Sequence, residues 1–79
     1  MEKIIYVRLL DEGTVVYRPV PAIEIKKDIF KIMRSDAYNP EDEIWEFLPG
    51  TCVLVEEKGL SDENILVAIK EQKLDDVSD

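Results

Sequence analysis

The stretch TCVLVEE at residues 51–57 carries the strongest strand pattern in the chain. Its β-branched and apolar residues favour a strand, and the pattern is too short for a stable helix. A second apolar run, ILVAI at residues 65–69, follows a polar segment. We expect the two runs to pair as a hairpin with residues 58–64 as the loop. The alternative is a helix over residues 62–74, with Ser61 as its N-cap.

Residues 4–10, IIYVRLL, predict a first strand. Alternation along this stretch places Ile5, Val7 and Leu9 on one face and puts Tyr6 on the other.

A long extended segment follows at residues 14–25 and contains Pro19 and Pro21. Proline lacks the amide donor of a strand ladder, which favours an edge strand or a strand bent between two parts of a curled sheet. A polar turn then leads to a third short strand at residues 29–33, so residues 23–33 predict a hairpin.

The longest irregular stretch covers residues 35–50, where Asn-Pro and Pro-Gly pairs indicate turns. Proline followed by acidic residues suits the first turn of a helix, which we expect at residues 40–44.

Together these patterns predict one all-β domain over residues 1–72, followed by an acidic, frayed tail at residues 73–79. The expected architecture is a small, strongly curled antiparallel sheet or an SH3-like, partly open barrel of about five strands. Closing the sheet removes exposed edges, which limits aggregation of small β-domains.

The composition narrows the range of functions. The 79 residues include 18 acidic and 10 basic side chains and no histidine, for a net charge of −8. Such acidity argues against nucleic acid and anionic membranes as partners. Without histidine, and with glycines that are far apart, the usual general base and a phosphate-binding loop are missing, so we expect no enzyme and no cofactor. The start of the chain does not resemble a signal peptide, and the expected location is the cytoplasm.

The chain contains several short motifs. They are Asp11-Glu12-Gly13 after Leu10, then Tyr17-Arg18-Pro19-Val20 with Ala22, Trp45-Glu46-Phe47 before Pro49-Gly50, and Leu66-Val67-Ala68. In this order they resemble a family of small bacterial proteins of unknown function. The similarity extends over most of residues 4–70. It implies a small, mainly β domain and supplies no catalytic residues.

Charge is divided unevenly between the two halves of the chain. Residues 1–34 carry seven basic and five acidic side chains, whereas residues 35–79 carry three basic and thirteen acidic ones. The densest acidic patch is the run EDEIWE at residues 41–46. One interpretation is a docking surface for a basic partner with Trp45 as its aromatic anchor. The alternative is a solvated loop whose Trp45 packs into the core.

We therefore predict a protein-interaction module that is a monomer or a weak homodimer. The candidate contact residues are Tyr38, Glu41, Asp42, Glu43, Trp45 and Arg18. The alternative function is an acidic inhibitor or immunity-type protein that blocks a basic active site, with its charge speeding association.

Further expectations concern Arg18, the acidic run and Cys52. Arg18 could join Tyr6 and Arg8 in an outer patch that binds a carboxylate or phosphate, or it could form an ion pair with Glu12 or Glu46. The acidic run does not match a calcium-loop spacing, and no metal site is expected. The lone Cys52 is interpreted as a small hydrophobic residue.

Overall fold

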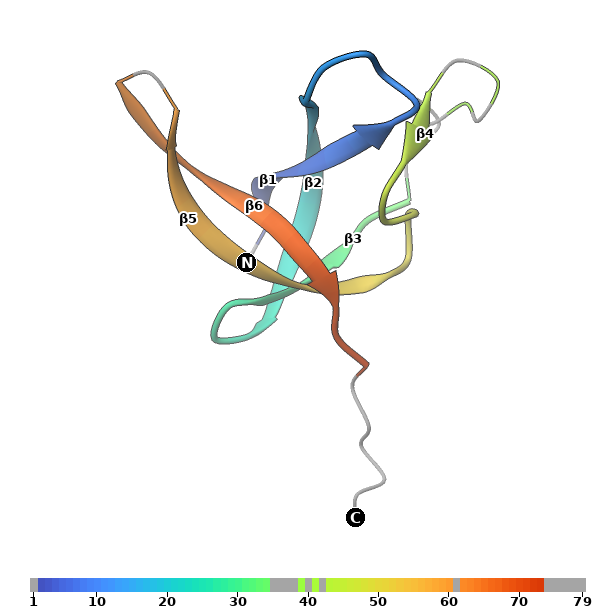
Figure 1. Ribbon diagram of the computed structural model, residues 1–79. Helices are drawn as coiled ribbons and strands as arrows, with labels where there is room; N and C mark the ends of the chain where they lie inside the picture. Colours follow the sequence, from blue (N-terminus) through green and yellow to red (C-terminus); the bar gives the residue numbers. More distant parts are fainter. Residues whose placement is uncertain (1, 35–38, 40, 42, 61, 74–79) are drawn as a thin grey trace.

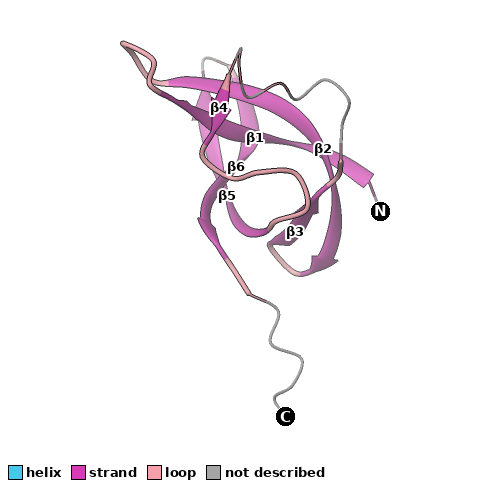
Figure 2. Cartoon of the chain, turned by 90° about the vertical axis from the view of Figure 1, so that its right-hand side faces the viewer, coloured by secondary structure: helices cyan, strands magenta, loops and turns pink. Residues whose placement is uncertain are grey.

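The computed structural model describes residues 2–34, 39, 41, 43–60 and 62–73, and they contain strands and loops but no helix (Figure 1, Figure 2). The strands are β1 (Glu2–Leu10), β2 (Val16–Lys26), β3 (Ile29–Ile32), β4 (Ile44–Trp45), β5 (Cys52–Leu60) and β6 (Glu63–Glu71). The predicted all-β domain is thus confirmed. The apolar run at residues 65–69 lies within β6, so the strand interpretation holds and the helix alternative is wrong.

Five of the strands form a ring. β1 pairs with β2, β2 with β3, β3 with β5 and β5 with β6, all antiparallel, and β6 returns to β1. Each antiparallel step reverses direction, so the fifth strand of the ring runs in the same direction as the first. β6 therefore meets β1 in parallel, at the register pair Tyr6 and Val67. The curled sheet is therefore antiparallel except at this one junction.

The long β2 strand joins two parts of the curled sheet. Its residues 16–23 pair with β1, and residues 22–26 pair with β3. Register irregularities between Glu24 and Lys26, and between Leu54 and Val55 in β5, increase the local curl. Of the two interpretations of the prolines, the bent strand is correct and the edge strand is wrong.

Two connections differ from the predicted ones. The loop expected at residues 58–64 is much shorter, because β5 continues to Leu60 and β6 begins at Glu63. The stretch at residues 35–50 contains the short strand β4, which pairs with the end of β1. The helical turn expected at residues 40–44 includes Pro40 and Asp42, which lie outside the described residues. The tail residues 74–79 lie outside them as well.

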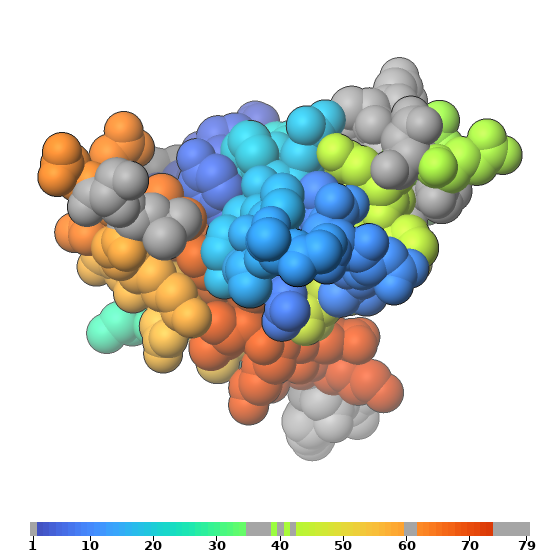
Figure 3. Space-filling model, turned by 45° about the horizontal axis from the view of Figure 1, so that its top comes forward, coloured from blue at the N-terminus to red at the C-terminus, as the bar shows by residue number. Residues whose placement is uncertain are grey.

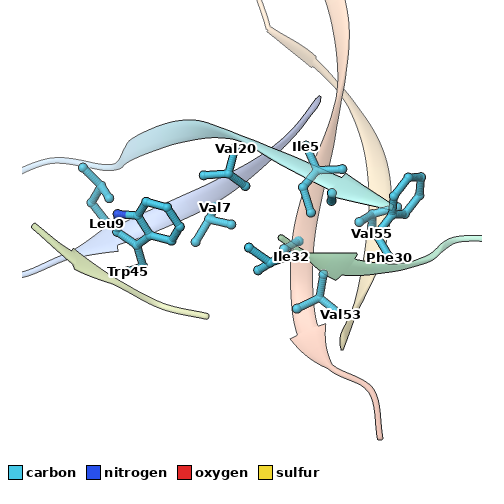
Figure 4. Close-up of a cluster of buried hydrophobic side chains, with 11 residues drawn as sticks. Ile5, Val7, Leu9, Val20, Phe30, Ile32, Trp45, Val53 and Val55 are labelled. Carbon is cyan, nitrogen blue, oxygen red and sulfur yellow. The ribbon is translucent and has the colours of Figure 1, made fainter. Parts of the chain in front are cut away.

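The core fills the inside of the ring. Ile5, Val7 and Leu9 are buried, as alternation along β1 predicts. Figure 4 shows Trp45 beside Leu9 at one end of the buried cluster and Phe30 near Val55 at the other. The remaining core residues are Val20, Ala22, Ile32, Val53, Val67 and Ala68. The buried residues come from every strand, so the ring has a continuous apolar interior.

The turn before β5 follows directly from its sequence. Pro49 and Gly50 occupy the central positions of a turn in which the Thr51 amide donates to the Leu48 carbonyl at 3.1 Å. Gly50 has a φ of 92°, a conformation that glycine adopts without steric cost. Its amide donates to the Ile32 carbonyl at 2.7 Å, which fixes the turn against the end of β3.

Candidate functional site

The acidic segment around β4 is organised by Glu43. The Trp45 indole Nε1–H donates to Glu43 Oε1 at 3.1 Å, and Arg18 Nε lies 3.5 Å from the same oxygen. The Arg18 side chain is 43% exposed and that of Glu43 is 27% exposed. An ion pair this exposed contributes little stability, up to about 1 kcal/mol. Its main effect is geometric, because one carboxylate oxygen joins β2 to β4.

Arg18 reaches Glu43 because it lies on the core-facing side of β2. It shares alternation with the buried Val20 and Ala22, and its register partner is the buried Val7. The predicted ion pair of Arg18 therefore forms, but with Glu43 rather than with Glu12 or Glu46. This placement also separates Arg18 from Tyr6 and Arg8, which lie on the outer side of β1.

A short turn that begins at Asn39 leads into β4. The amide of Glu41 donates to Asn39 Oδ1 at 2.9 Å, and the amide of Glu43 donates to the Asn39 carbonyl at 3.0 Å. The second bond spans four residues, as in one turn of a helix. Asn39 thus caps the turn, and Glu41 remains exposed at its start.

Trp45 is a core residue. Its residue exposure is 3%, and its strand partner is the buried Leu9. The structure thus decides between the two interpretations of Trp45 in favour of core packing. Of the other predicted contact residues, Tyr38 and Asp42 lie outside the described residues.

The apolar side chains that do face solvent here are Leu10 and Ile44. They are register partners on β1 and β4, with exposures of 38% and 41%. Because alternation puts Trp45 inside, its neighbours Ile44 and Glu46 point outward. The pair was not predicted from the sequence because β4 was not recognised as a strand, although the alternation of residues 43–47 carries the signal.

Charged residues continue along the outer side of β1. The amide of Glu46 donates to the Arg8 carbonyl at 2.8 Å, which extends the β1–β4 pairing by one residue. Next to it is an open hollow of about 270 Å³, where Arg8 and Glu46 meet Tyr17 and Lys58 above β6. The hollow contains both cationic and anionic groups, so it favours neither sign of ligand.

The described residues show no other chemistry that indicates a reaction. No group of three or more Cys, Asp or Glu side chains among them is placed to hold a metal ion. Cys52 is a half-buried free thiol on β5. This part of the chain also contains no helix long and apolar enough to span a bilayer.

Comparisons with known proteins returned no match. No family model, curated protein or solved structure is significantly similar to the chain. The resemblance of the sequence motifs to small bacterial proteins therefore stays a prediction.

Proposed function

We propose that this chain is a small, non-catalytic module that docks a basic segment of a partner protein on the outer side of β1 and β4. The observation that carries the proposal is the adjacent, exposed pair Leu10 and Ile44. Large apolar side chains that meet on an exposed surface are typical of protein contacts.

Acidic residues lie close to this apolar pair in the sequence. Glu41 and Glu46 flank Ile44 in sequence, and Asp11 and Glu12 follow Leu10, all with exposed side chains. We call these six residues the β1–β4 face. Figure 3 shows the β1–β2 connection, which carries Asp11 and Glu12, between the β4 segment and the β5–β6 hairpin. Apolar groups with carboxylates nearby in the sequence suit a partner that presents lysine or arginine beside apolar side chains.

The position of β4 favours an extended partner. β4 stands at the end of the strand order, and its outer edge pairs with no described strand. Side chains of an extended segment that lies along the exposed side of β4 would alternate between Ile44 and solvent, which suits a basic segment with apolar residues at every second position.

Glu43, Trp45 and Arg18 have a supporting role in this proposal. Their contacts hold β4 against the barrel, so that Ile44 faces outward. Tyr38 and Asp42 adjoin the face in sequence and remain proposed partner contacts.

The proposal can be tested by selecting binders from a random peptide library displayed on phage. We expect the selected peptides to be basic with interspersed apolar residues. Their affinity should fall at least about tenfold for the variant L10S/I44S, because the apolar centre of an interface carries most of its binding energy. The control is Ile25→Ser, since Ile25 has a similar exposure of 40% at the far end of β2.

Equal binding to wild type and to L10S/I44S would overturn the proposal. So would an equal loss of affinity in Ile25→Ser, which would show that any exposed apolar group suffices. Circular dichroism of each variant separates lost binding from lost folding.

A second candidate function is inhibition of a basic enzyme. It is favoured by a second acidic surface, because the end of the β5–β6 hairpin exposes Glu56, Glu57, Asp62 and Glu63. An inhibitor should bind fast and with strong salt dependence. Charge reversal at Glu56 and Glu57 would then slow association, whereas docking through the β1–β4 face alone would leave it unchanged.

A further inference from the structure

A second surface, of opposite charge, lies at the other end of the barrel. It is an open hollow of about 420 Å³ lined by Ile23, Lys31, Ile32, Met33, Arg34 and Gly50. We call it the β2–β3 hollow. Its volume falls within the range of ligand pockets, and its lining joins apolar side chains to two cations.

Backbone hydrogen bonds hold the hollow to β2 and to the turn before β5. The Met33 amide donates to the Pro21 carbonyl of β2 at 3.0 Å, and the Ile32 amide donates to the Thr51 carbonyl at 2.9 Å. The Gly50 amide donates to the Ile32 carbonyl, so both backbone groups of Ile32 are bonded to residues 50–51. The hollow is therefore a preformed feature of the sheet, and a ligand would not have to order it.

The apolar part of the hollow continues along the outer side of β1 and β2. Ile23 is 40% exposed, and Pro21 lies two residues away on the same side of β2. The register partner of Pro21 is Ile4, which is 53% exposed. Pro21 and Ile23 are about 7 Å apart along the strand, so the strip spans about two residues of an extended peptide.

The charge of this surface is the reverse of the chain's net charge. Lys31 is the register partner of Ile23, and Lys31 and Arg34 both have exposed side chains at the hollow. Ile23 also has a register partner on β1, which is Glu2. The positive charge is therefore concentrated at the β3 side, where an anionic group would be attracted most.

We propose that the β2–β3 hollow binds an acidic peptide segment of a partner protein, with apolar side chains on Ile23 and Met33 and carboxylates beside Lys31 and Arg34. Arginine can take a carboxylate through two parallel hydrogen bonds, which adds direction to the attraction. The apolar lining favours a segment with apolar side chains over a small anion, and the two cations favour an acidic segment over a basic one.

This site is independent of the β1–β4 face. Ile4 and Leu10 are six residues apart on β1, which corresponds to about 20 Å of extended strand. The two surfaces therefore lie at opposite ends of β1, and a partner at one leaves the other accessible. A module with both surfaces could hold a basic and an acidic segment at once.

The test uses the full chain and a fluorescent peptide of alternating aspartate and leucine. We expect saturable binding, followed by fluorescence anisotropy, with amide NMR shifts at Met33 and Gly50. The variant K31E/R34E should lower the affinity at least about tenfold, because two attractive contacts become repulsive. The matched control is K26E/K27E, which changes the net charge equally near the β2–β3 turn but outside the hollow.

Three results would contradict binding at the β2–β3 hollow. Equal losses in K31E/R34E and K26E/K27E would mean general attraction to the basic half of the chain and would overturn the proposal. Equal binding of a peptide with lysine in place of aspartate, or shifts confined to residues around Ile44, would also overturn it. The variant I23S separates the apolar contribution to binding from the charge contribution, since it keeps both cations. We expect this single substitution to weaken binding of the peptide.

Discussion

Two neighbouring cross-strand pairs at the end of β1 have opposite environments. Leu9 and Trp45 face the interior and are buried, whereas Leu10 and Ile44 face solvent. The four residues differ little in hydrophobicity, and the pairs are separated by one step along the strands. The difference arises from the pleat alone, because successive side chains of a strand point to opposite sides.

The two pairs give the short strand β4 two roles. The inner pair anchors β4 to the core, with Glu43 and Arg18 supporting the indole ring. The outer pair places apolar surface in an acidic setting, where it stabilises the fold little. We infer that substitutions on the inner side should change stability and substitutions on the outer side should change binding.

The largest expected effect is that of Trp45→Ala. Truncating a buried tryptophan should lower the free energy of unfolding by about 3–5 kcal/mol. For a small domain this is a large part of the total stability. The measurement is urea denaturation followed by circular dichroism, with Ile44→Ala as the paired variant, expected within about 0.5 kcal/mol of wild type.

If Trp45→Ala does not fold, Trp45→Phe retains an aromatic ring in the core and should give an intermediate stability. A folded Trp45→Ala protein that is as stable as Ile44→Ala would contradict the inner position of the indole ring.

The next largest effect is a difference in stability between variants of the two leucines of β1. Leu9→Ala should cost about 2–5 kcal/mol, because Leu9 is buried in the core cluster beside Trp45. Leu10→Ala should cost less than about 1 kcal/mol and instead weaken peptide binding at the β1–β4 face. Thermal unfolding of both variants checks the first part. Similar losses of stability would show that both sides of β1 are equally packed.

The smallest effect concerns Glu43. Glu43→Ala removes both the indole contact and the ion pair with Arg18, and should cost about 1–2 kcal/mol. Glu43→Gln keeps an oxygen that can accept the indole hydrogen, so its cost should be about half as large. Denaturation at low and high salt separates the contributions, because only the ion pair is screened. A cost that is equal in the two variants would assign the whole effect to charge.

The sequence predicts the paired strands of the barrel better than their closure. Alternation at Ile5, Val7 and Leu9 predicts the buried side of β1, and the hairpin of residues 23–33 forms as expected. These features depend on local pattern. The parallel contact of β6 with β1 joins residues that are 61 positions apart, Tyr6 and Val67, so no local pattern encodes it.

The candidate site was predicted in part. The acidic segment at residues 41–46 contributes Glu41, Ile44 and Glu46 to the proposed β1–β4 face, and Arg18 pairs with Glu43. The identity of the apolar contact was missed, because a strand of two residues is too short to give a periodic signal. Only pairing with β1 decides which of Ile44 and Trp45 faces outward.

By itself the sequence determined an all-β chain, the inner residues of its first strand, and the concentration of negative charge in its second half. Tertiary structure decided that the five ring strands close on one another, that Trp45 belongs to the core, and that the cations Lys31 and Arg34 meet beside an apolar hollow. The physical reason is the range of the forces involved. Strand patterns reflect the alternation of neighbouring side chains, whereas burial and contacts between residues far apart in sequence, such as the ion pair of Arg18 with Glu43, exist only once the chain has closed around its core.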